Sequence, residues 1–211
     1  HFFSRNFRAV AAAHPECLSK LTDSAFLSEL GRGLMARASS AHSIAKRKEQ
    51  LVMFFRTEYL RSGMLLLDGA PLEVVQRQYT EFSDLFFTTL YRLSRRETRK
   101  ISDKKVDTRD KAAIFTTGGR GREEAFDDDI DMVVLSEGLT EDQLERLRQI
   151  LGRMNSQIVK LGIFPQYRMA DHFGEFVTPL DMAADHLLSS SPNLFLDMTE
   201  FLELRMVEGS S

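Results

Sequence analysis

The sequence predicts an α+β protein, in which an N-terminal helical bundle precedes a small mixed sheet. Apolar residues recur at helical spacing through the first half, and after about residue 103 short strand-like runs alternate with helical patterns. A chain of 211 residues, 43% of them hydrophobic, is long enough to bury a substantial core. We expect a helical bundle over residues 1–102, an α/β core over 103–191 and a C-terminal helix over 192–211 that packs back on the core.

Two long helices are expected in the bundle. The first follows the basic start Lys46–Lys48, and Gly69–Pro71 breaks it, because a proline suits a first helical turn. The second is expected to run to about Arg99 and carries a long apolar stripe: Leu72, Val75, Tyr79, Phe82, Phe86, Leu90 and Leu93. The polar stretch Ser102–Asp110 is typical of a linker.

Four strands and two helices are expected in the remainder. A capping box is indicated at Thr140, because Gln143 stands three residues later, and Gly162 suits the end of the helix that follows. A last helix is expected over Phe195–Met206. The expected strands are Ala112–Thr116, Ile130–Leu135, Ile163–Met169 and Glu175–Leu180.

The composition of the chain argues against some kinds of binding partner and some cellular compartments. A formal net charge of −3 argues against nucleic acid as a partner, although it leaves room for a local basic groove. The single cysteine, Cys17, allows no internal disulfide, so a cytoplasmic, reducing location is expected. The longest apolar run, around Met64–Leu67, is far shorter than a membrane span, and no membrane partner is expected.

The stretch from Gly118 to Asp131 carries the chemistry. Glycines at 118, 119 and 121 let the backbone approach a phosphate closely and point N–H groups at it. Asp129 and Asp131 are two residues apart on an expected strand, so both side chains leave the same face. Paired carboxylates suit hard cations such as Mg²⁺ or Mn²⁺, and two such ions can activate a hydroxyl and stabilise pyrophosphate.

The simpler interpretation of the acidic run is a solvated loop. Such a loop does not continue directly into Met132–Leu135, an apolar run suited to a buried strand. Asp131 is embedded in that run and would be costly to bury without a cation or a partner. The combination of glycine turn, acids and apolar strand therefore favours a catalytic site.

These motifs resemble those of the DNA-polymerase-β-type nucleotidyltransferase superfamily. The resemblance rests on Gly118-Gly119, on Arg122-Glu123, and on Asp129-x-Asp131 leading into a strand. The pattern is most similar to that of the bacterial glutamine synthetase adenylyltransferases, and the related PII uridylyltransferases have a similar motif. Flanking segments such as His14–Glu16 and Glu200–Arg205 resemble the same enzymes.

The resemblance implies an enzyme that moves a nucleoside monophosphate from a nucleoside triphosphate to a hydroxyl acceptor and releases pyrophosphate. It suggests ATP as donor and a protein tyrosine as acceptor, on a metabolic enzyme or a signalling protein. Asp129 and Asp131 would bind the metal, and Arg120 or Arg122 would neutralise phosphates held by Gly118, Gly119 and Gly121. Removal of the nucleotide by phosphorolysis stays open.

One departure from the resembled family concerns its third metal-binding aspartate. Aligning Arg168 and Gly174 to the family pattern puts Phe164 at that position. Asp171 or Asp181 could supply the missing carboxylate, and Asp181 is favoured because a strand holds a side chain more rigidly than a turn does. The alternative is that Asp181 caps the final helical region and that Asp171 is solvated. Without a third acid, a degenerate domain that senses nucleotide or binds a partner is the alternative. A helical interaction protein whose acidic loop binds nothing is a third hypothesis.

Overall fold

The computed structural model describes residues 2–101, 107–108, 111–124, 130–162, 167–169, 177–189 and 204–209. The chain divides into two compact units, His1–Leu93 and Ser94–Ser211. This division lies inside a long helix, earlier than the boundary expected after residue 102. None of the helices in the described ranges combines the length and the apolar character that a membrane span requires.

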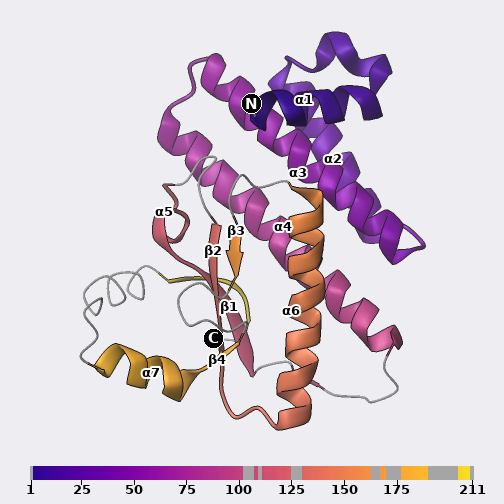
Figure 1. The fold of residues 1–211 in the computed structure, drawn as a ribbon. Coiled ribbons are helices and arrows are strands. Elements are labelled where there is room, and N and C mark those ends of the chain that lie inside the picture. Colours follow the sequence, from indigo (N-terminus) through magenta and orange to yellow (C-terminus); the bar gives the residue numbers. More distant parts are fainter. Residues whose placement is uncertain are drawn as a thin grey trace. The chain divides into compact units, whose positions relative to one another are not determined.

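The first unit is helical, as the sequence predicts (Figure 1). Side chains just before two of the helices accept their first backbone N–H groups. Asp23 accepts from the N–H groups of Ala25 and Phe26, and Ser43 accepts from that of Lys46. The elements that begin in this unit are α1 (Phe2–Ala13), the 3₁₀ helix η1 (Pro15–Lys20), α2 (Ser24–Ser40), α3 (Ile44–Leu67) and α4 (Leu72–Ile101).

The core of this unit follows the helical spacing of its apolar residues. One buried cluster joins α1, η1, α2 and α3 through Val10, Leu21, Leu27, Leu60 and Met64. Aromatic rings from α3 and α4 pack edge to face beside it, with the ring centroids of Phe55 and Phe82 5.3 Å apart. The phenylalanines of α3 and α4 are therefore core residues.

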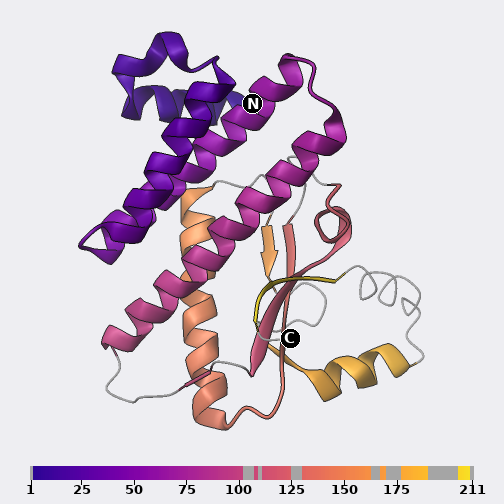
Figure 2. The ribbon, with the colours of Figure 1, turned by 180° about the vertical axis from the view of Figure 1, so that it is seen from behind.

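The second unit contains a mixed sheet in the order β3-β2-β1-β5, with β4 paired to β2 beyond β3. Strand β1 (Ala112–Thr116) is antiparallel to both β2 (Ile130–Ser136) and the edge strand β5 (Arg205–Glu208) (Figure 2). The short strands β3 (Tyr167–Met169) and β4 (Thr178–Pro179) run parallel to β2. These findings confirm the α+β class and the expected strand over 112–116.

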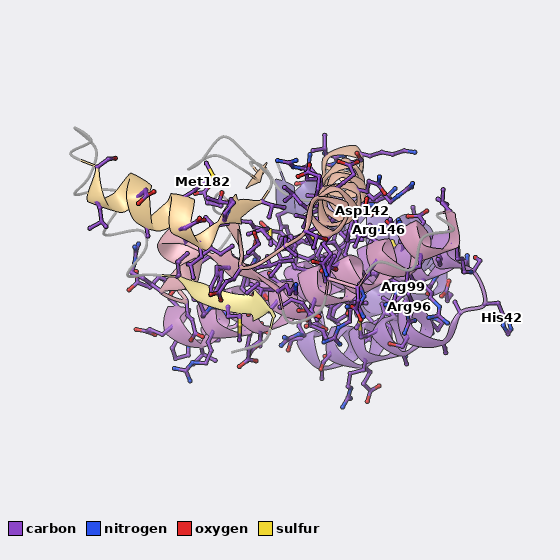
Figure 3. The ribbon with its side chains drawn as sticks, turned by 90° about the horizontal axis from the view of Figure 1, so that it is seen from below. His42, Arg96, Arg99, Asp142, Arg146 and Met182 are labelled. Carbon is purple, nitrogen blue, oxygen red and sulfur yellow. The ribbon has the colours of Figure 1, made fainter. Side chains whose placement is uncertain are left out.

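Helix α6 (Glu141–Leu161) connects the parallel strands β2 and β3. Its ends are those that the sequence predicts: Thr140 and Gln143 form a capping box, and Gly162 ends the helix with a left-handed φ of 51°. Arg146 in its second turn is buried and donates from Nη1 to the carbonyl oxygen of Thr98 over 3.3 Å. In the end-on view of Figure 3, Asp142 and Arg146 of α6 lie on one side of the strands, and Met182 of α7 (Leu180–Leu188) lies on the other.

Both faces of the sheet carry buried side chains, and each face has its own set of residues. Ile114, Met132 and Val134 share one face through the antiparallel register of β1 and β2. The alternate residues Val133 and Leu135 form the other face. They pack against Ala183 of α7, with Phe115 and Leu204 beside them. The strand period thus assigns each residue of β2 to a face, and Asp131 belongs with Val133 and Leu135.

Two expected elements are corrected by the structure. Arg205 and Met206 lie in β5, so the helix expected over Phe195–Met206 does not include them. As a strand, Arg205–Glu208 forms backbone hydrogen bonds with the free edge of β1, which a helix could not do. Leu180 begins α7, so the strand expected over Glu175–Leu180 ends earlier, at Pro179.

Candidate functional site

A tight turn follows β1 and presents the glycine-rich sequence. Residues Gly118–Gly121 form one helical turn, α5, which is closed by hydrogen bonds such as that from the N–H of Arg122 to the oxygen of Gly118 at 3.1 Å. Gly118 has a φ of 59°, a left-handed conformation that favours glycine. No heavy atom of the described residues lies within 4 Å of the place where a Cβ would stand. Within the described part of the chain, no side chain or backbone atom therefore covers this position.

The turn is fastened to the strand that bears Asp131. The N–H of Thr117 donates to the carbonyl oxygen of Asp131 over 3.4 Å, which continues the register Thr116↔Met132 by one pair. Thr117 keeps an extended backbone, so its side chain leaves the sheet on the same face as that of Asp131. Asp131 is half-buried, and its Oδ1 atom is buried. An acidic oxygen therefore lies beside the open glycine turn.

The two arginines of the turn are in different environments. Arg120 is only 1% exposed and is the largest of the fully buried side chains in the described residues. Arg122 is exposed, and its Nε lies 2.8 Å from Oε2 of Glu124. Of the two arginines expected to neutralise phosphates, Arg122 is exposed and Arg120 is buried in this structure.

The neighbouring strand β3 places Arg168 in register with Asp131. Thr117, Asp131 and Arg168 thus occupy one row across three strands. Asp129, Phe164 and Asp171 lie outside the described residues, so the expected pairing of Asp129 with Asp131 stays a prediction. Within the described ranges, no group of three or more histidine, cysteine or acidic side chains is placed to hold a metal ion.

Asp181 lies at the other end of the sheet from Asp131. Parallel pairing sets Thr178 beside Leu135 and Pro179 beside Ser136, and the chain continues away from Asp131. Asp131 and Ser136 are themselves separated by about 16 Å at the usual rise of a strand. Asp181 is exposed in the first turn of α7, where its Oδ1 accepts the N–H of Met182 at 2.9 Å. The structure does not bring Asp181 to Asp131.

The cavity that Asp181 lines is also distant from Asp131. It has a volume of about 620 Å³ and lies where the β2–α6 loop meets the start of α7. Its lining is mixed and includes Glu137, Leu144, Leu180 and Ala184. Nearby, Nζ of Lys111 donates to the carbonyl oxygen of Gly138 over 2.8 Å and fastens this loop to the chain before β1.

Residues 61–172, slightly more than half of the chain, match the model of a protein family described as "Putative nucleotidyltransferase DUF294". The chain belongs to this nucleotidyltransferase family. No curated protein matches the sequence. The matched residues of this nucleotidyltransferase contain the whole stretch from Gly118 to Asp131, as well as Arg168, and they end before Asp181. The match supports nucleotidyl transfer in general and does not assign the chain to the adenylyltransferase or uridylyltransferase branch.

One polar residue beside Asp131 is not indicated by the sequence of this nucleotidyltransferase. Thr117 is 4% exposed and lies opposite Asp131. A threonine next to a glycine pair carries little signal alone, because only the register of β1 against β2 shows which of Thr116 and Thr117 shares a face with the acid.

Proposed function

We propose that this domain transfers a nucleoside monophosphate from a nucleoside triphosphate, with ATP as donor, to a hydroxyl acceptor in a metal-dependent reaction. The acceptor class we propose is a protein tyrosine, and reversal by phosphorolysis uses the same site. The proposal on donor and acceptor draws on the resemblance to adenylyltransferases, and the family match supports nucleotidyl transfer itself.

The observation that carries this proposal is the junction of the glycine turn with the acidic strand. A triphosphate needs backbone N–H groups and space close to the main chain, and Gly118 offers both at an open left-handed position. It also needs positive charge, which the exposed side chain of Arg122 can supply. Both features lie at the end of β2 that carries Asp131.

The residues present fit a hard divalent cation. A carboxylate with one buried oxygen, at a site open to phosphates, is the donor that Mg²⁺ prefers, and Asp129 would add a second carboxylate from the same face. When bound, Mg²⁺ supplies charge stabilisation to the phosphate oxygens and a lowered pKa to a coordinated hydroxyl. Asp131 and Asp129 would hold it.

The proposed reaction balances as a displacement at phosphorus. The acceptor oxygen forms a bond to the α-phosphorus while the bond from that phosphorus to the oxygen bridging the α- and β-phosphates breaks. Pyrophosphate leaves with that oxygen, and the acceptor's proton passes to solvent or a base. The glycine turn orients the triphosphate, and Arg122 offsets the charge that accumulates on the leaving pyrophosphate.

Transfer of label tests the reaction. ATP labelled at the α-phosphorus and ATP labelled at the γ-phosphorus are each incubated with the chain, Mg²⁺ and a cell lysate, and labelled protein is counted. Lysate without the chain gives the background from other enzymes, and only label above that background is counted. We expect chain-dependent label from the α-position only, and none with Asp131→Asn. Chain-dependent label from the γ-position would indicate a kinase-like reaction and contradict the proposal.

A second candidate function is a binding module that holds nucleotide without transferring it. The position of Asp181 favours it, because one of two candidates for the third carboxylate lies at the far end of β2. Mg²⁺-dependent binding of ATP without transfer of the α-label to any protein would support this module over the enzyme.

A further inference from the structure

We infer that the hydroxyl of Thr117 is a phosphate-binding group of the nucleotide site. This inference rests on the proposed function and adds a residue that neither the motif nor the family match identifies. The ligand is the triphosphate of a metal-bound nucleotide, and the contact is a hydrogen bond from the threonine hydroxyl to a phosphate oxygen.

The position of Thr117 carries the first step. It directly opposes Asp131, with its N–H on the carbonyl oxygen of that residue. In antiparallel strands, two residues paired in this way have Cα atoms about 5.5 Å apart and side chains on one face. The hydroxyl of Thr117 and the carboxylate of Asp131 are therefore neighbours. Gly118, the open position, follows Thr117 in the chain.

The second argument is the environment of the Thr117 hydroxyl. Thr117 is 4% exposed, and it stands at the N-cap of α5, where a threonine usually accepts a backbone N–H. It makes no such capping bond, and within the described residues its hydroxyl has no hydrogen-bond partner. Oγ1 of Thr117 is not among the buried partnerless atoms of the described residues, which include Oγ1 of Thr116, so the hydroxyl is accessible to a ligand although the residue is almost fully buried.

The chain offers a matched control in the adjacent residue. Thr116 is 0% exposed, and its Oγ1 is buried with no partner in the described part of the chain. Strand alternation directs Thr116 to the opposite face, among Ile114, Met132 and Val134. Thr116 ends β1 and Thr117 follows it, so the two threonines are adjacent, chemically identical and almost fully buried, and they differ in whether they face Asp131.

The experiment compares Thr117→Val, Thr117→Ser and Thr116→Val with the parent chain. ATP affinity is measured at saturating Mg²⁺, and the thermal midpoint is measured without ligand. Valine keeps the shape of threonine and removes the hydroxyl, so both valine variants should have thermal midpoints equal to or above that of the parent. Thr117→Val should bind ATP about ten- to a hundredfold more weakly, the usual effect of losing a hydrogen bond to a charged group.

The controls should behave differently. Thr116→Val should bind ATP as the parent does, and Thr117→Ser should retain most of the affinity because it keeps the hydroxyl. Parent-like ATP affinity in Thr117→Val, or an equal loss in Thr116→Val, would overturn the inference and leave the proposed function intact. Absence of Mg²⁺-dependent ATP binding in the parent would instead overturn the proposed function, and the inference with it.

Discussion

The backbone N–H of Thr117 donates to the carbonyl oxygen of Asp131 over 3.4 Å. This bond joins the end of β1 to the start of β2, so the glycine turn and Asp131 lie at the same end of these two strands. The row continues to Arg168 on β3, in register with Asp131. Residues separated by more than thirty positions in the chain thus lie in one row. The first predictions below test the candidate site at this row.

Gly118→Ala should weaken ATP binding because the added methyl group would occupy space that the phosphates need. Gly118 and Gly138 both have a φ of 59° and open space around them, so alanine at either should cost about 1 kcal/mol of backbone strain. Only the methyl group at Gly118 would stand where phosphates approach. Denaturant unfolding and ATP titration of both variants check this. Equal ATP affinities in the two variants would count against a phosphate site at Gly118.

Arg122→Gln should lower ATP affinity and leave stability almost unchanged. The ion pair with Glu124 is exposed, and exposed pairs contribute roughly 0–1 kcal/mol. Arg120→Ala should lower stability and change ATP affinity less, because deleting a large buried side chain typically costs about 2–5 kcal/mol. Thermal unfolding and ATP titration separate the two. The assignment fails if Arg122→Gln binds ATP like the parent.

Asp181→Asn should keep Mg²⁺-dependent ATP binding at the parent level. Asp181 lies beyond the end of β2 opposite to Asp131, and its Oδ1 accepts the N–H of Met182. An asparagine oxygen can accept the same bond, so folding should change little. Titration of Mg²⁺ at fixed ATP is the measurement, and a large rise in the Mg²⁺ requirement would restore Asp181 to the site.

Glu58 should make the stability of the first unit depend on pH. The side chain is buried, and desolvation raises its pKa from the ordinary value of 4.5, although Arg61, whose Nε lies 2.6 Å from its Oε2, opposes that shift. The folded state therefore binds this proton more tightly than the unfolded state does. The contribution of Glu58 to the free energy of unfolding should decrease as pH rises from about 4.5 through the raised pKa.

Glu58→Gln removes that contribution, so its free energy of unfolding should fall less than that of the parent over the same pH range. Glu49→Gln is the control, because Glu49 is an exposed acid on the same helix, 2.9 Å from Nζ of Lys46. Denaturant unfolding at a series of pH values gives the slopes. Equal slopes for the parent and Glu58→Gln would show that the burial of this carboxyl has no such effect.

Local features of the fold could be predicted because their causes are local. The capping box at Thr140, the left-handed Gly162 and the strand over 112–116 each depend on residues within a few positions, and all three are confirmed. Strand β5 is different. The alternation of Leu202, Leu204 and Met206 is compatible with a strand, but only the free edge of β1 decides between strand and helix.

The candidate site could be predicted in part for the same reason. The glycine turn and Asp131 are close in sequence, so their chemistry can be read together. The distance from Asp181 to Asp131 depends on which end of β2 pairs with β4. The face on which Thr117 lies depends on the register of β1 against β2. Both are contacts between distant segments. The apolar pattern of a strand decides which face is buried, but it does not identify the partner residues on a strand far away in the sequence. Burial similarly separates Arg120 from Arg122, which the sequence treats alike.

The most direct test of the central claim is calorimetric titration of ATP into the parent chain and into Asp131→Asn, with Mg²⁺ and with a chelator. The amide keeps the shape of the carboxylate and removes the charge that would hold the cation. We predict that the parent binds ATP with Mg²⁺ but not with the chelator, and that Asp131→Asn, folded as well as the parent by thermal unfolding, does not bind it in either condition. ATP binding that is unchanged by the chelator and by Asp131→Asn would contradict a metal-dependent nucleotide site at Asp131.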